Sequence, residues 1–171
     1  MDTWDAIRSR RNVRTYTEQP IAPEDLDRIL EAGRRAPSAS NRQGWDFVVC
    51  TDRSQLQRLS QVWRGGGHVA GSAATIALIA AEPPDQHARD VTEYDLGQAT
   101  MSIMLAAAGL GIGSCHSSVE DQALARDVLG LPEDRVCAWL ISLGYPADRP
   151  LRPIRKPNRR PFEEVVHRDR W

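Results

Sequence analysis

Cysteine is scarce in this 171-residue chain, and the three cysteines follow no recognisable pattern. Cys50, Cys115 and Cys137 are odd in number and widely spaced, which excludes a disulfide framework and a site of paired zinc ligands. Long apolar runs are also missing, because the longest one, 69–81, is shorter than the roughly 18 to 20 residues of a membrane span. No apolar stretch follows the N-terminal arginines, as a secretory signal would require. We therefore expect a cytoplasmic protein with no membrane association and no metal site.

An excess of charge of either sign is absent as well. Acidic and basic residues nearly balance, giving a formal net charge of −1, and the chain is 41% hydrophobic and 26% charged. Such a composition disfavours a disordered chain and a protein that binds nucleic acid through bulk charge. The length predicts one globular domain over 1–171, large enough to bury a core of its own.

Lysine is nearly absent, since Lys156 is the only lysine among 22 basic residues. Compositional bias of the genome explains most of the arginines, but it does not explain their placement. Four arginines lie in the first fifteen residues, and seven more lie with Lys156 in the last 23. If the two ends of the chain meet in space, they form an anion-binding site.

Hydrophobic periodicity and helix caps predict alternating helices and strands. Helices are expected at 3–12 and 23–36, from a cap at Ser54 to about 64, and at 94–110 and 121–129. Strands are expected at 46–51, 73–81, 112–117 and 136–143. This alternation indicates a sheet covered by helices, of the α/β or the α+β class. The remainder, 144–171, is rich in proline and arginine and reads as a tail that must be held by another part of the protein.

Three polar segments are not explained by these elements. The first, Arg10 to Arg14, reads as a solvated helix end or as a set of guanidinium groups for phosphate; an RNA-binding arm is a weaker alternative. The second, 36–45, is a connecting loop whose amide and hydroxyl groups suit a planar heteroaromatic ring. The third, 111–117, carries glycines that end a helix or let the backbone approach a flat ligand.

Four blocks of the chain resemble the nitroreductase family. They are IRSRRNVRTYTEQPI, EAGRRAPSASNRQGWDFVV, DLGQATMSIMLAAAGLGIGSC and the ending LGYPADRP with RRPFEEVVH. The resemblance follows the family's order and spacing over nearly the whole chain. It departs from the family at Asn12, where Ser is usual, and at Gly44, where Pro is usual, and both departures bear on the choice of substrate.

The resemblance implies a fold, a cofactor and a set of binding residues. The implied fold is an α+β, three-layer α/β/α sandwich with a central mixed, mostly antiparallel sheet, in an obligate homodimer that holds FMN at the subunit interface. The tail at 144–171 would then pack on the partner subunit or on the cofactor site. The implied FMN-binding residues are Arg10, Arg11, Asn12 and Arg14; Pro37, Ser38, Asn41 and Gln43 from the other subunit; backbone at Gly113, Ser114 and Cys115; and Arg159 or Arg160 at the phosphate.

The implied activity is the ping-pong transfer of reducing equivalents from NAD(P)H through FMN to an electron-poor acceptor such as a nitroaromatic or a quinone. Because FMN carries this chemistry, no catalytic acid, base or nucleophile is expected from the protein. Cys115 and His116 do not form a nucleophilic pair, since adjacent strand residues point to opposite faces. His68 follows three glycines and is expected to be an exposed loop residue, with contact to the substrate as the alternative. The alternatives are flavin cleavage, dehalogenation or dehydrogenation on the same scaffold, a deazaflavin cofactor, or a non-catalytic flavin sensor or carrier.

Overall fold

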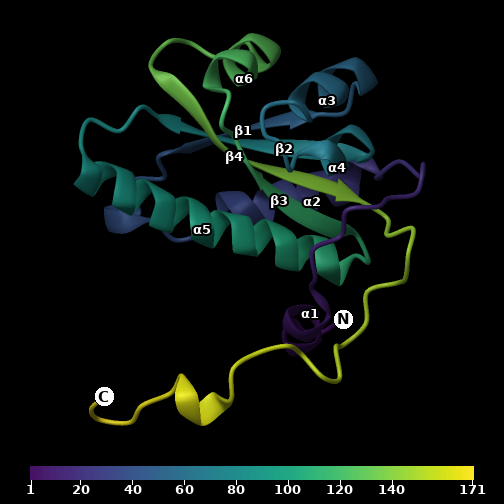
Figure 1. Cartoon of the computed structure of the whole chain (residues 1–171), viewed down its shortest axis with the longest axis vertical. Coiled ribbons are helices and arrows are strands. Elements are labelled where there is room, and N and C mark those ends of the chain that lie inside the picture. The colour runs from purple at the N-terminus through teal and green to yellow at the C-terminus, as the bar shows by residue number, and fades with distance from the viewer.

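The centre of the molecule is a four-stranded sheet in the order β1-β2-β4-β3, seen edge-on between helices in Figure 1. The computed structural model describes all residues, 1–171. The strands are β1 (Trp45–Cys50), β2 (Ala74–Ala81), β3 (Gly113–Ser118) and β4 (Arg135–Gly144). The α-helices are α1 (Thr3–Ser9), α2 (Pro23–Arg34), α3 (Arg53–Leu59), α4 (Gly67–Ala70), α5 (Gln86–Gly109) and α6 (Gln122–Leu129). Short 3-10 turns lie at η1 (Ala39–Asn41) and η2 (Phe162–Glu164).

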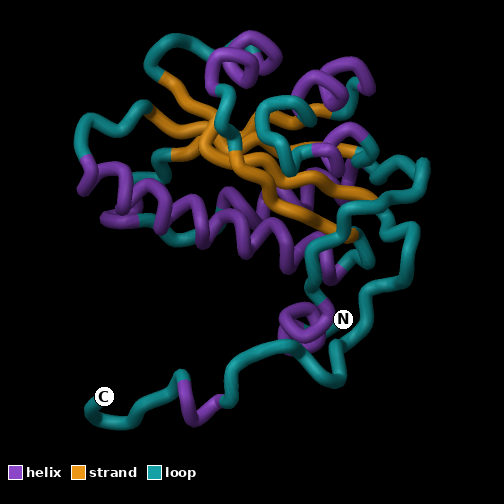
Figure 2. The backbone as a smooth tube through the Cα atoms, in the orientation of Figure 1, coloured by secondary structure: helices purple, strands orange, loops and turns teal.

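Helices cover both faces of the sheet, which confirms an α+β fold with three layers. Alternate residues of β2 point to opposite faces, because side chains alternate along a strand. Ile76 and Leu78 pack with Ile29 of α2 and with Ile103 of α5. The other face of the sheet packs against α3, α4 and α6. Figure 2 shows the same layering in the backbone trace.

The expected mixed sheet is wrong for these four strands, because all three neighbouring pairs are antiparallel. The only parallel pairing is an isolated bridge between Asn12 and Ser114. The N-terminal segment crosses the end of the sheet instead of running along it, since Tyr16 already pairs with Pro146 beyond β4. A crossing segment makes a few backbone hydrogen bonds but adds no parallel strand.

Two helix starts also differ from the prediction, and in both cases an aspartate is the cap. Asp85 accepts a hydrogen bond from Ala88 N (2.8 Å), so α5 begins eight residues before Tyr94. Asp52, and not Ser54, caps α3 by accepting from Gln55 N (2.9 Å). The first turns of α5 are polar and exposed, and therefore lack the apolar repeat that marks a helix in a sequence.

The tail is held at its beginning and leaves the body of the protein afterwards. Leu151 is buried together with Val13 and Ala108, and Ile154 N donates to Arg8 O (3.0 Å). Beyond this point the chain passes α1 and ends away from the sheet (Figure 1). The beginning of the tail therefore lies beside the N-terminal segment, whereas the C-terminus lies apart from it (Figure 1). None of the helices combines the length and the apolar character needed to cross a bilayer.

Candidate functional site

The segment from Arg10 to Arg14 is fixed to the sheet through its backbone. Val13 N donates to Ser114 O (3.0 Å), and the Val13 side chain is completely buried. A Cβ atom at Gly113 would lie 2.7 Å from Val13 Cγ2, so only glycine allows the segment to approach β3 this closely. The structure thus brings together two of the predicted site segments, 10–14 and 113–115.

Arg10, Asn12 and Arg14 place positive charge and an amide beside β3. Arg10 Nη1 donates to Asn12 Oδ1 (3.1 Å), whereas Arg14 is exposed and has no side-chain hydrogen bond. Partial desolvation of its ring lowers the pKa of His116, and the charges of Arg10 and Arg14 lower it further. These guanidinium groups suit an anion, and the amide suits a neutral polar group.

The Cys115 thiol is unsuited to act as a nucleophile. Burial raises its pKa, and the opposing effects of Arg14 and Arg10 are smaller than the effect of burial. Cys115 is buried while His116 is exposed, so the two side chains point to opposite faces of β3, as predicted. The thiol therefore stays protonated and unpaired with a base near neutral pH.

His68 is buried, contrary to the expectation of an exposed loop residue. It lies in α4 and is only 8% exposed, with Nδ1 located 2.8 Å from Ser142 Oγ. Ser142 Oγ lies in turn 2.7 Å from the Tyr16 hydroxyl. Burial lowers the pKa of His68, and Arg14 and His116 contribute to the same shift. The glycines before His68 suggested a loop, and nothing in the sequence signals its partner 74 residues away.

The Nε2 atom of His68 is buried without a hydrogen-bond partner in the chain. An unpaired buried polar atom is costly and marks a place where a ligand can supply the missing partner. The charge of Arg14 lowers the pKa of His68, so this guanidinium group acts electrostatically on the ring. This atom is therefore a further candidate contact of a polar ligand.

Arg11 is turned toward the tail. Its Nη2 donates to Asp148 Oδ1 and to Arg149 O, both at 2.7 Å, and the pKa of Asp148 is lowered mainly by the first of these hydrogen bonds. The Arg11 side chain is 14% exposed. Arg11 thus joins the two ends of the chain, and a contact with a phosphate stays a prediction.

Arg159 and Arg160 lie in the part of the tail that leaves the body of the protein. Arg159 donates to Asn158 O (2.7 Å) and Arg160 to Glu164 O (2.9 Å), and both arginines are exposed. No hydrogen bond or ion pair joins them to the segment 10–14. Their role at a phosphate therefore also stays a prediction.

The loop between Pro37 and Gly44 has an unusual backbone conformation. Ser40, Asn41 and Gln43 have φ values of 52°, 55° and 51°, which non-glycine residues rarely adopt. Two side chains hold this conformation. Ser38 Oγ accepts from Gln43 N (2.9 Å), and both carboxylate oxygens of Asp95 accept from Ala39 N at 3.1 Å.

Asp95 lies on α5 and is only 8% exposed. Its only hydrogen bonds within the chain are those from Ala39 N, 56 residues earlier. Burying a carboxylate is unfavourable unless it accepts hydrogen bonds, and Ala39 N supplies them here. The contact therefore fixes the start of the loop against α5. The loop makes no hydrogen bond to the segment 10–14 of the same chain, and its role at a flavin stays a prediction.

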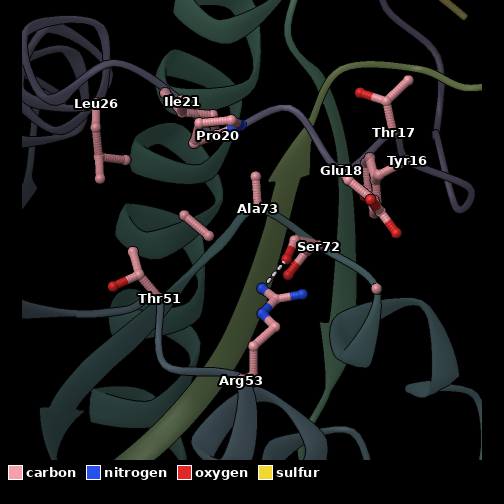
Figure 3. Close-up of a pocket in the computed structure, with 12 residues that line it drawn as sticks. Tyr16, Thr17, Glu18, Pro20, Ile21, Leu26, Thr51, Arg53, Ser72 and Ala73 are labelled. Atoms are coloured by element: carbon pink, nitrogen blue, oxygen red, sulfur yellow. Dashed lines mark hydrogen bonds between the residues drawn. The ribbon is translucent and has the colours of Figure 1, made fainter.

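The largest cavity, about 720 Å³, lies elsewhere, between the chain at Tyr16–Leu26 and the ends of β1 and β2 (Figure 3). Its one guanidinium group, Arg53, donates to Ser72 O and is thereby occupied by the backbone. A smaller cavity of about 270 Å³ lies against β3 and α5 and is lined by His116 and Trp139, whose rings meet edge to face with centroids 6.0 Å apart. The second cavity borders the candidate site, because His116 of β3 is one of its lining residues.

Comparisons with known proteins agree with this geometry. The sequence pattern that describes the Nitroreductase family matches residues 7–75 and 61–145. The chain belongs to the nitroreductase family. A nitroreductase relative from Archaeoglobus fulgidus, provisionally named NADH dehydrogenase/NAD(P)H nitroreductase, is 35% identical over 169 residues, which cover 96% of each chain.

Two solved structures show the same fold. The FMN-dependent nitroreductase of Clostridium difficile R20291 is 27% identical, with a TM-score of 0.85 over 98% of this chain and 99% of that one. The NADPH:FMN oxidoreductase of Vibrio harveyi, solved in complex with NAD+, is 27% identical, with a TM-score of 0.84 over 99% of this chain and 77% of that one. Relatives that use flavin and nicotinamide nucleotides therefore share nearly the whole of this fold.

Proposed function

We propose that this protein is an FMN-dependent oxidoreductase that takes electrons from NAD(P)H and passes them, in a ping-pong cycle, to an electron-poor acceptor such as a nitroaromatic or a quinone. Membership in the nitroreductase family supports an NAD(P)H-dependent oxidoreductase in general. The observation that carries the proposal for this chain is the group formed by Arg10, Asn12 and Arg14, fixed beside Gly113–Cys115 of β3.

The residues present fit FMN. Arg10 and Arg14 provide guanidinium groups for its phosphate or for negative charge on the reduced ring, and Asn12 provides an amide for its hydroxyl and carbonyl groups. The orphaned Nε2 of His68 offers one more polar contact. When bound, FMN supplies the hydride chemistry, and the protein binds and orients it. No side chain of the site is positioned as a nucleophile.

The loop 37–44 completes this site from a second subunit. Within one chain the loop is bonded to Asp95 in the first half of α5, whereas the segment 10–14 is bonded to Ser114 beyond the end of α5, so a partner subunit would bring the two to one flavin. Large apolar side chains stand exposed on α1, on α5 and in the tail, as an interface would explain: Trp4 (65%), Tyr94 (73%), Met101 (45%) and Phe162 (65%). Sedimentation of the purified protein is expected to give a dimer, and a stable 19.1 kDa monomer that retains flavin would contradict the two-subunit site.

The absorption spectrum of the purified protein tests the cofactor, and stopped-flow mixing tests the activity. We expect the visible bands of an oxidised flavin, which NADH or NADPH bleaches in the absence of oxygen and a nitroaromatic or quinone restores. Steady-state rates at varied donor and acceptor should give parallel double-reciprocal lines. A colourless protein that takes up no added FMN would refute the proposal.

A further inference from the structure

The beginning of the tail carries arginine at every third position. Arg149, Arg152 and Arg155 alternate with Pro150 and Pro153. Proline-rich segments of this kind favour the polyproline II helix, which has three residues per turn and rises about 3.1 Å per residue. Side chains spaced by three residues therefore lie on one face, about 9 Å apart. The sequence thus lines up the three guanidinium groups.

The structure fixes this segment and shows the three arginines together. The apolar side is anchored, because Leu151 is buried against Val13 and Ala108 and Ile154 N donates to Arg8 O. The arginine side faces open space. A cavity of about 370 Å³ is lined by Arg149, Arg152 and Arg155 together with Arg11. We name these three tail arginines the arginine row.

The charge of the arginine row is not compensated within the chain. Its three side chains make no hydrogen bond and no ion pair, and the nearby Asp148 is already bonded to Arg11. Three other surface arginines, Arg34, Arg58 and Arg135, each have a carboxylate partner. Like charges gathered on one cavity repel each other, and an anion that enters removes this repulsion.

We propose that the arginine row is a binding site for the phosphomonoester dianion of a nucleotide, separate from the guanidinium groups of Arg10 and Arg14. Guanidinium groups hold phosphate through paired N–H···O bonds, and several of them together match a dianion. This inference rests on the proposed function, in which two nucleotides carry such a group: FMN has a 5′-phosphate, and NADPH has a 2′-phosphate that NADH lacks. If the arginine row binds the 2′-phosphate of NADPH, it determines the preference of the enzyme for NADPH over NADH.

The test compares the wild-type protein with R152A, R155A and the double variant R152A/R155A. Arg168→Ala is the matched control, because Arg168 is an exposed tail arginine without a carboxylate partner that lies outside the cavity. The measured quantities are the Kd values for FMN and riboflavin on the apoprotein, from quenching of flavin fluorescence, and the KM values for NADPH and NADH on the FMN-loaded enzyme.

The double variant is expected to lose affinity for one of the two nucleotides, FMN or NADPH, and not for its counterpart without the phosphate. If the row holds the FMN phosphate, the Kd for FMN rises at least tenfold while the Kd for riboflavin stays constant. If it holds the 2′-phosphate, the KM for NADPH rises at least tenfold while the KM for NADH stays constant. Arg168→Ala should change none of the four constants. All four constants within twofold of wild type in the double variant, or equal losses in R168A, would overturn the proposal.

A separate measurement keeps this inference independent of the enzyme activity. Inorganic phosphate is expected to raise the melting temperature of the wild-type apoprotein, and to raise it less in R152A/R155A, at constant ionic strength set with chloride. Equal shifts in the two proteins would overturn the site. A wild-type protein that binds no FMN but shows this difference would instead refute the proposed function and leave the phosphate site supported.

Discussion

The two polar segments that are expected to meet at one flavin, 10–14 and 37–44, are held in different ways. The segment 10–14 is attached by backbone: Val13 N bonds to Ser114 O, and Val13 is buried against Gly113. The loop 37–44 keeps three exposed residues at positive φ and is held by two side-chain acceptors, one of them the buried Asp95.

The two modes of attachment suit the two segments to different roles in binding the cofactor. A segment bonded to the sheet has one position relative to the sheet, so its arginines can hold a charged group with little loss of freedom on binding. A strained loop held by side chains depends on a few contacts, and its shape can change with one substitution. We therefore expect the segment 10–14 to set the affinity for the cofactor and the loop to adjust it.

The largest effect is expected from removing the charges of the first segment. The double variant R10A/R14A should raise the Kd for FMN about 100-fold or more, because each charge-assisted contact contributes about 1.5 to 3 kcal/mol. Fluorescence titration of the apoprotein measures this change. Arg28→Ala, an exposed arginine on α2, is the control and should bind FMN as the wild type does. Unchanged affinity in the double variant would remove the assignment of this segment to the phosphate.

The close approach of the first segment to β3 can be tested by adding one methyl group. Gly113→Ala places a Cβ atom 2.7 Å from Val13 Cγ2 and should lower the free energy of unfolding by about 1 to 3 kcal/mol, as overpacking does. Urea unfolding measures this loss. Gly97→Ala is a suitable control, since a Cβ atom there meets nothing within 4 Å. Equal stability of G113A and the wild type would show that the segment is not held where we find it.

A smaller effect is expected from releasing the loop. Asp95→Ala removes the acceptor and Ala39→Pro removes the donor of the same hydrogen bond, and proline is tolerated at the first position of the turn. Each variant should weaken FMN binding about tenfold, which corresponds to about 1.4 kcal/mol.

The double variant D95A/A39P should bind FMN no more weakly than either single variant, because both remove one interaction. Asp121→Ala, which removes the cap of α6, controls for lost stability far from the loop. Additive losses in the double variant would show that Asp95 does not act through Ala39.

The smallest expected effect is a change in how the stability of the protein depends on pH. Because burial lowers the pKa of His68 in the folded protein, the unfolded chain binds a proton more readily, and stability falls as the pH drops below about 6.5. His68→Gln should make this fall shallower, by less than the roughly 1.4 kcal/mol per pH unit that one whole proton contributes. An identical slope in H68Q would show that His68 does not titrate differently on unfolding.

The sheet could be predicted from the sequence because its strands are short apolar runs with clear ends. Each predicted strand lies within one residue of the observed one, and β2 is buried on both faces, as its apolar run indicates. The start of α5 could not be predicted, because its polar first turns carry no apolar repeat and the cap at Asp85 is a single residue.

Site residues whose position depends on partners far away in the sequence could not be predicted. The burial of His68 follows from Ser142, and the role of Asp95 follows from Ala39; each pair is joined only by the folded chain. The meeting of the two arginine-rich ends was anticipated from charge placement. However, the arginines that the structure brings to Arg11 are Arg149, Arg152 and Arg155, and not the pair near the C-terminus.

Gly113 and Gly144 stand opposite each other on β3 and β4, and each faces one side chain of the N-terminal segment, Val13 and Tyr16 respectively. Only two residues, Arg14 and Thr15, separate these two contacts along the chain. Inserting or deleting a residue at 14 or 15 would therefore dislodge one of the two side chains and carry the neighbouring arginines out of alignment with the sheet. Homologous chains should vary in length in the tail beyond 155 and hold this short crossing at a constant number of residues.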